Sequence, residues 1–161
     1  MSLFYVNFGG NVNSKQIGNI GEARVLAEFV KHKIPVFIPF GDNERADLVA
    51  EINGSLCKIQ VKTAAYTNDG KATFSLTSST EHRKNGIKRR YTKDEIDYFA
   101  LYSLERDKVY LVKAPDEPKS AITIRFLHTK NSQQAGIKYE EDYLFENVII
   151  DLQQNKTGRE F

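Results

Sequence analysis

Three polar residues occur where two neighbouring strands would bring them together. Asp47 begins one apolar run, and Gln60 and Lys62 lie two positions apart in the next run, beyond an Asn53-Gly54 turn. Because side chains alternate along a strand, Gln60 and Lys62 point to one face, and cross-strand pairing can place Asp47 beside them. Phosphodiester hydrolysis requires a divalent cation held by oxygen ligands, a nucleophilic water and positive charge near the phosphate. The residue types and their spacing suit this chemistry.

Each of these residues has a possible role in such a site. Asp47 and Gln60 can supply oxygen ligands, and the peptide carbonyl of Val61 can add another hard ligand. Lys62 can orient or deprotonate the water and stabilise the charged transition state.

Glu22 is a fourth candidate side chain. It lies on the flank of a helical pattern, between turns that present Val25, Leu26 and Phe29, and it leans toward the core. A carboxylate there needs a partner such as a metal or Lys62, because an unpaired buried charge is costly. The alternative is that Glu22 lies just past the apolar stripe, in water. For the set as a whole we predict the catalytic residues Glu22, Asp47, Gln60 and Lys62, and the metal ligands Asp47, Gln60, Val61 and Glu22.

The elements that must position these residues begin with a helix. From Ile17 onward apolar residues recur at steps of three and four, which predicts an amphipathic helix that ends near His32-Lys33, before Pro35. We expect residues 1–16 to form an N-terminal extension and residues 17–161 to form a single domain.

Strands dominate the remainder of the predicted fold. Asn53-Gly54 is the strongest hairpin signal, because a type I′ turn needs positive φ at both central positions, and Asn68-Asp69-Gly70 predicts a second turn. The order of elements indicates a mixed α/β or α+β sheet with few helices. Strands are predicted at 36–38, 47–52, 56–64, 72–76, 98–102, 109–112, 122–127 and 148–152, and a short helix at 139–145.

Charge is unevenly distributed along the chain, although the net charge is only +2. Residues 1–93 contain 14 Lys or Arg against 8 Asp or Glu, whereas residues 94–161 contain 9 against 13. The run 82–93 contains six cations and no acid, so it is either a polyanion-binding segment or a solvated loop. With a tight turn at Asn85-Gly86 it could form a ribbon that a DNA major groove would admit. The predicted DNA-binding residues are Arg83, Lys84, Lys88, Arg89, Arg90 and Lys93.

Composition limits the classes of protein. A chain of 161 residues with 40% hydrophobic content can bury one core. The single cysteine, Cys57, excludes an internal disulfide, and no Cys/His cluster suggests zinc. No stretch approaches the roughly 18 apolar residues of a membrane span, and the first residues lack signal-peptide features. We therefore expect a soluble, cytoplasmic protein without a membrane partner.

Four blocks of the sequence resemble a known family. Helical Glu22, Asp47 and Gln60-Val61-Lys62 resemble the PD-(D/E)XK nuclease superfamily, in the branch where glutamine replaces the usual acid before x-Lys. More narrowly, the segments 18–24, 45–49, 59–63 and 97–100 are similar to cyanobacterial group I intron-encoded homing endonucleases. The resemblance covers roughly residues 17–113.

This resemblance implies a restriction-endonuclease-like core, in which helices flank a mixed β-sheet. It also implies Mg²⁺-dependent cleavage of both strands of double-stranded DNA during intron homing, with Mn²⁺ as a possible substitute. The protein would act as a homo-oligomer, with a dimer as the minimum and a tetramer as the alternative. Independently of the resemblance, the acidic half offers apolar surface at 122–127 and 143–150, which we predict as an interface. This sequence has Gln60 where the commoner family pattern has an acidic residue. Because the amide is neutral, the site should attract a second cation more weakly.

Other functions are compatible with the same residues. A Holliday-junction resolvase or repair nuclease of the same superfamily would share the metal site and differ in its preferred DNA shape. A catalytically silent DNA-binding module would use the basic run without metal. An oligomerisation domain unrelated to nucleic acid would leave the four candidate residues and the basic run unexplained.

Overall fold

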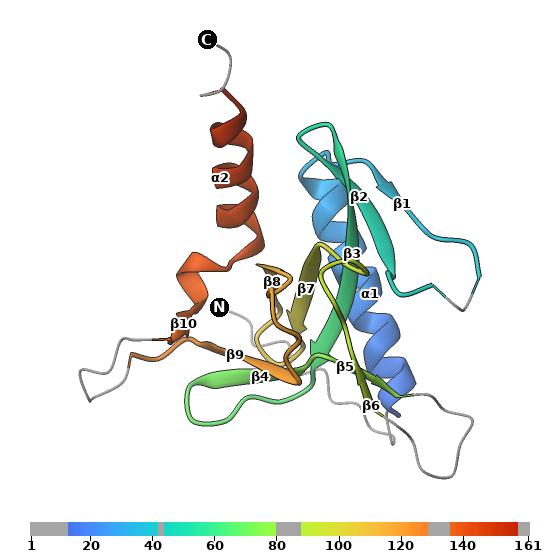
Figure 1. Ribbon diagram of the computed structural model, residues 1–161. Helices are drawn as coiled ribbons and strands as arrows, with labels where there is room; N and C mark the ends of the chain where they lie inside the picture. The colour runs from blue at the N-terminus through green and yellow to red at the C-terminus, as the bar shows by residue number, and fades with distance from the viewer. Residues whose placement is uncertain (1–12, 42–43, 80–87, 129–135, 158–161) are drawn as a thin grey trace.

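A mixed five-stranded sheet forms the centre of the fold (Figure 1). The structure is a computed structural model that describes residues 13–41, 44–79, 88–128 and 136–157. The strand order is β1-β2-β3-β7-β8, with β3 and β7 parallel and the other neighbours antiparallel. The strands are β1 (Val36–Phe37), β2 (Leu48–Ile52), β3 (Ser55–Ala64), β7 (Tyr98–Ser103) and β8 (Lys108–Lys113).

Helix α1 (Ser14–Lys31) begins before the predicted Ile17. The reason is a capping box, in which the Asn13 side chain accepts from the Gln16 backbone N–H at 2.9 Å and Gln16 Oε1 accepts from the Asn13 N–H at 3.0 Å. Residues 14–16, assigned to the extension from sequence, therefore form the first turn of the helix.

Two hydrophobic cores lie on opposite faces of the sheet. Val25 and Phe29 of α1 pack with Ile59 and Val61 of β3 on one face. The other face carries a second core, which includes Phe99 and packs beneath a three-stranded sheet of order β10-β9-β4. That sheet consists of β4 (Lys71–Ser75), β9 (Ala121–Arg125) and β10 (Lys138–Tyr139). Alternation along β3 therefore separates Gln60 and Lys62 from the helix-covered face.

The predicted turns are confirmed. Asn53 and Gly54 have φ angles of 55° and 77°, as a type I′ turn between β2 and β3 requires. Asp69 and Gly70 likewise have positive φ before β4. The strands predicted at 98–102 and 109–112 correspond to β7 and β8, which pair antiparallel.

The C-terminal region corrects two predictions. Residues 148–152 belong to helix α2 (Phe145–Thr157) and not to a strand, whereas the predicted helix at 139–145 is a 3-10 turn, η1 (Glu140–Asp142). Phe145, Val148, Ile149 and Leu152 recur at helical spacing and pack on the first core. None of the described helices is long and apolar enough to cross a bilayer.

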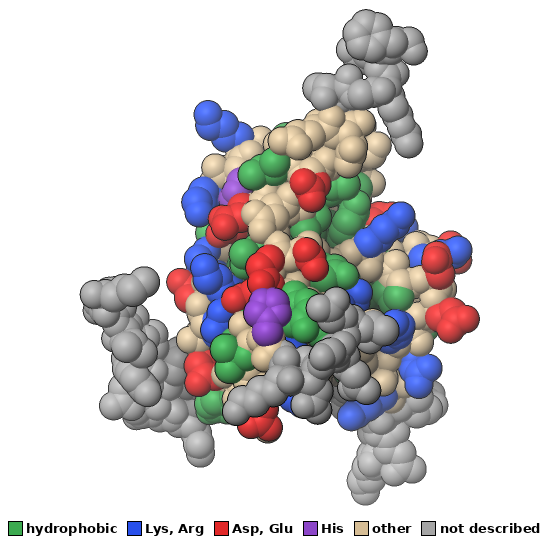
Figure 2. Space-filling model, turned by 90° about the vertical axis from the view of Figure 1, so that its left-hand side faces the viewer, with side chains coloured by type: hydrophobic (Ala, Val, Ile, Leu, Met, Phe, Trp, Pro, Cys, Tyr) green, Lys and Arg blue, Asp and Glu red, His purple; other side chains and the backbone are tan. Residues whose placement is uncertain are grey.

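Burial leaves little of the expected oligomer interface exposed. Ile122, Ile124 and Ile149 lie inside the protein's own cores, and of the large apolar side chains in the two proposed stretches only Leu127 and Ile150 are markedly exposed among the described residues. On the face shown in Figure 2, acidic side chains lie among the hydrophobic side chains of the described residues and interrupt the apolar surface there.

A small antiparallel ribbon, β5 (Thr77–Ser79) with β6 (Lys88–Arg90), lies beside the carboxyl end of β3 (Figure 1). It carries part of the basic run. The predicted turn at Asn85-Gly86 lies outside the described residues.

Candidate active site

Asp47 and Gln60 meet directly across the β2–β3 pair. The Asp47 N–H donates to the Ile59 carbonyl at 2.9 Å, which extends the ladder by one residue beyond the Leu48–Ile59 pair. Gln60 Nε2 then donates to Asp47 Oδ2 at 2.5 Å, and the Val61 N–H donates to the same oxygen at 2.8 Å. The predicted cross-strand contact is present in the structure.

The Gln60 amide links two oxygens that were predicted as metal ligands. Its Nε2 also donates to the Val61 carbonyl at 3.2 Å, so one nitrogen contacts both the Asp47 carboxylate and the Val61 peptide oxygen. A half-turn of the amide would present Oε1 in place of that nitrogen. Together these groups offer hard oxygens of the kind that Mg²⁺ binds.

Burial makes the Asp47 carboxylate costly in the absence of a cation. Desolvation raises the pKa of Asp47, and hydrogen bonding from Val61 and Gln60 and the charge of Lys62 only partly oppose it. A divalent cation would favour the ionised form. Among the described residues no group of three or more His, Cys, Asp and Glu side chains is arranged around a common point, so a cation here would need amide or peptide oxygens as well.

Glu22 lies near Asp47 and Lys62 because α1 approaches β3 closely at the neighbouring residue, Gly21. A Cβ on Gly21 would lie only 1.8 Å from Thr63 Oγ1, so any larger residue would push the helix away. Burial, followed by the charge of Asp47, raises the pKa of Glu22, while Lys62 lowers it. Glu22 is exposed overall. It therefore lies at the solvent side of the site, within electrostatic reach of Asp47 and Lys62.

Lys62 points from the same face of β3 toward the base of the ribbon. Its Nζ donates to the Thr77 carbonyl at 3.1 Å and to the Tyr91 hydroxyl at 3.2 Å. Asp47 is hydrogen-bonded to Gln60, and Glu22 interacts electrostatically with Asp47 and Lys62, so the four predicted catalytic residues lie close together around β3, the central strand of the sheet. Lys62 is held on the ribbon side.

Comparison with known proteins defines the family. The model of a family described as PD-(D/E)XK endonuclease matches residues 12–146. The chain belongs to the PD-(D/E)XK endonuclease family. The solved structure of a bacterial homing endonuclease, I-Ssp6803I, superimposes with a TM-score of 0.69 at 22% identity, over 93% of this chain and 100% of that one. At this identity the likeness establishes the fold, which confirms the predicted class. No curated protein matches the sequence significantly.

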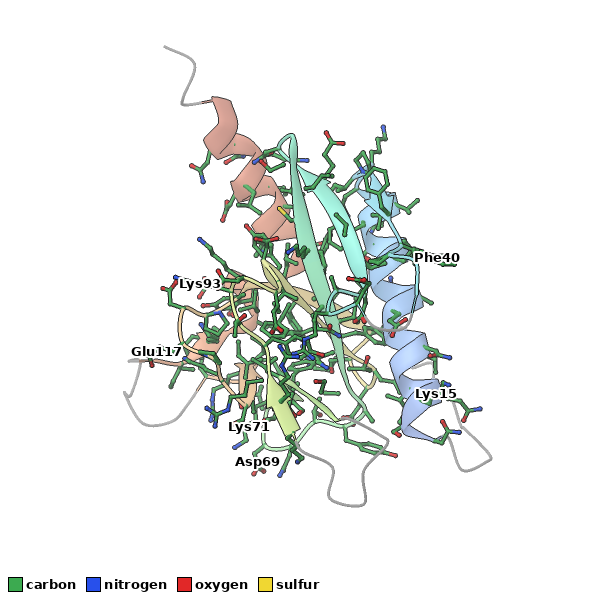
Figure 3. The ribbon with its side chains drawn as sticks, turned by 45° about the vertical axis from the view of Figure 1, so that its right-hand side comes forward. Lys15, Phe40, Asp69, Lys71, Lys93 and Glu117 are labelled. Carbon is green, nitrogen blue, oxygen red and sulfur yellow. The ribbon has the colours of Figure 1, made fainter. Side chains whose placement is uncertain are left out.

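The predicted DNA-binding cations of this PD-(D/E)XK endonuclease lie partly on the ribbon. Lys88, Arg89 and Arg90 are exposed, and Arg89 forms an ion pair with Glu95. Lys93 Nζ lies 3.6 Å from Asp116 Oδ1, on the same side of the molecule as Glu117 (Figure 3). Arg83 and Lys84 lie outside the described residues.

Two residues near the site, Arg45 and Tyr91, were not predicted from sequence. The Arg45 guanidinium lies 3.9 Å from the centre of the Tyr91 ring and donates to Ser78 Oγ at 2.7 Å and to the Arg90 carbonyl at 3.2 Å. Arg45 thereby fastens the segment before Asp47 to both ribbon strands. The only sequence signal was an arginine two residues before Asp47 and one aromatic residue within a basic run, which does not specify these contacts.

Proposed function

We propose that this protein is a Mg²⁺-dependent homing endonuclease that cuts both strands of a specific double-stranded DNA and so promotes intron homing. The observation that carries the proposal is the convergence of Asp47 Oδ2 and the Val61 carbonyl on the Gln60 amide, with Lys62 on the same strand face. The I-Ssp6803I fold, described as that of a homing endonuclease, supports the choice of homing.

The residues present fit a hard divalent cation. Asp47, the amide oxygen of Gln60 and the Val61 carbonyl would hold it, with Glu22 contributing from the solvent side. Bound Mg²⁺, or Mn²⁺ in its place, would polarise the phosphate and acidify a water molecule. Lys62 would orient that water and offset negative charge on the phosphate during attack.

DNA would approach along the ribbon side of the site. Lys88 and Arg90 are exposed there and can contact phosphates, which fix register without reading sequence. One site per subunit cuts one strand, so cleavage of both strands favours a homo-oligomer, a dimer or tetramer, that presents two sites to the duplex.

The first test is cleavage of three DNA substrates with and without Mg²⁺: supercoiled plasmid, a four-way junction, and duplex carrying an intron-insertion site. A homing endonuclease should cut the duplex into two fragments. Preferential cutting of the junction would favour a resolvase, and binding without cutting would favour a silent DNA-binding module. Light scattering at micromolar concentration tests the assembly, since a monomer that makes double-strand breaks would contradict the homo-oligomer.

The second test separates chemistry from binding. Asp47→Asn and Lys62→Ala should abolish cleavage and leave DNA affinity largely intact, because both groups would act mainly in the transition state. Asn is a conservative replacement, since both hydrogen bonds to Asp47 use Oδ2 and one amide oxygen can accept both. Normal turnover by either variant would show that the active site lies elsewhere.

A further inference from the structure

The ammonium of Lys62 is held at the base of the β5–β6 ribbon. Its two acceptors are the Thr77 carbonyl at 3.1 Å and the Tyr91 hydroxyl at 3.2 Å. Thr77 pairs with Arg90, the residue before Tyr91, so both acceptors come from the same end of the ribbon (Figure 1). We propose that Tyr91 is a positioning residue that aims Lys62 at the reacting phosphate. This inference rests on the proposed function of Lys62.

Positioning matters because a lysine side chain is long and rotatable. An ammonium with one acceptor can still swing about it, whereas two acceptors restrict its position and lower the cost of ordering it in the transition state. Catalytic geometry depends on supporting groups of this kind, and a displacement of about 1 Å can slow a reaction about 100-fold.

Tyr91 is itself firmly held, as a positioning residue must be. Its side chain is only 6% exposed, and its ring packs edge-on against Phe99 with a centroid distance of 5.7 Å. The Arg45 guanidinium covers the ring at 3.9 Å, and Lys62 Nζ lies 4.9 Å from the ring centroid. Favourable cation–π contacts therefore add to the hydrogen bond.

Arg45 connects this support to the acid side of the site. It stacks on Tyr91, bonds both ribbon strands through Ser78 and the Arg90 carbonyl, and lies two residues before Asp47. Glu95 forms an ion pair with Arg45 at 3.3 Å, which offsets the charge of two cations on one ring. The ribbon that would contact DNA is therefore joined to both Asp47 and Lys62.

The decisive variant is Tyr91→Phe, which removes the hydroxyl and keeps the ring contacts with Phe99 and Arg45. Tyr102→Phe is a matched control, because Tyr102 is 4% exposed and its hydroxyl donates to Asp107 Oδ1 at 3.0 Å, away from Lys62. Loss of a hydrogen bond to a charged group predicts a roughly tenfold slower single-turnover cleavage by Tyr91→Phe. DNA affinity should stay within about twofold, and Tyr102→Phe should cleave at the wild-type rate.

A second readout follows Lys62 without substrate. In ¹H–¹⁵N spectra of the lysine ammonium groups, the Lys62 signal is assigned by its absence in Lys62→Ala. Tyr91→Phe should shift or broaden that signal, and Tyr102→Phe should leave it unchanged. The inference is overturned if Tyr91→Phe leaves the signal and the cleavage rate unchanged, or if both Tyr→Phe variants slow cleavage equally. Equal cleavage by wild type and Lys62→Ala would instead overturn the proposed function.

Discussion

Replacing Gln60 by Glu tests the central contact of the site. In the wild type the Gln60 amide donates to Asp47 Oδ2 at 2.5 Å and to the Val61 carbonyl at 3.2 Å. A carboxylate at this position would face another carboxylate and a carbonyl oxygen without a proton between them. We therefore expect Gln60→Glu to unfold more easily than the wild type in metal-free buffer near pH 8.

The magnitude follows from two terms. A hydrogen bond to a charged group contributes about 1.5–3 kcal/mol, and two unit charges 4 Å apart repel by about 4 kcal/mol at an effective dielectric constant of 20. Solvent at the site screens the repulsion, and the pair can retain one proton, which limits the cost. We expect the free energy of unfolding to fall by about 2–3 kcal/mol at pH 8. Near pH 4 a shared proton restores the hydrogen bond, so the loss should largely disappear.

Urea denaturation at pH 8 and pH 4 with EDTA measures this effect. Gln60→Met removes the amide without adding charge, so its loss of stability should be much less dependent on pH. Asp47→Asn combined with Gln60→Glu exchanges the amide and the carboxylate and should recover most of the loss at pH 8. Mg²⁺ should stabilise Gln60→Glu more than the wild type. The added carboxylate should bind the cation more tightly, and a ligand stabilises the folded state more when it binds more tightly. A Gln60→Glu protein as stable as wild type at pH 8, or a double variant no more stable than Gln60→Glu, would refute the reasoning.

Three further predictions concern packing, charge and DNA. Gly21→Ala should lower the free energy of unfolding by about 2 kcal/mol, whereas Gly18→Ala, with open space around its Cβ, should be neutral or stabilising; Thr63→Ala should rescue Gly21→Ala in urea denaturation. Burial raises the pKa of Asp47 above 3.8, so metal-free Asp47→Asn should gain thermal stability over wild type at pH 7 and lose that advantage below about pH 4. If Arg90 contacts a phosphate, Arg90→Ala should reduce the slope of log affinity against log salt concentration by about 0.9. An unchanged slope would show that Arg90 makes no phosphate contact.

Short-range signals in the sequence specified the centre of the fold. Asn53-Gly54 restricts the chain to a two-residue turn, and that turn fixes the register of β2 against β3. Once the register is fixed, Asp47 must lie opposite Gln60, and alternation must place Lys62 on the same face. These contacts were therefore predictable from local chemistry.

Longer-range contacts were not predictable in this way. Residues 148–152 form a β-branched, apolar run typical of a strand, but Phe145 and Ile149 pack on the first core only as a helix. The Gly21–Thr63 approach and the stacking of Arg45 on Tyr91 join segments that are far apart in sequence. No periodicity encodes such pairs, because they depend on how complete elements pack.

Glutamine at position 60 has a physical rationale in both states of the proposed site. Without a cation, its amide satisfies Asp47 and the Val61 carbonyl, so the folded protein avoids two apposed anions beside Glu22. With a cation, the same side chain can offer its oxygen after a half-turn, but it adds no negative charge. Glu22, Asp47 and Lys62 then leave a net formal charge of −1, which attracts one divalent cation better than two. An amide at position 60 thus stabilises the metal-free fold and lowers the affinity of the site for a cation. The negatively charged oxygens of a bound DNA phosphate would supply the charge that the amide lacks, so we expect the cation to bind more tightly when DNA is bound.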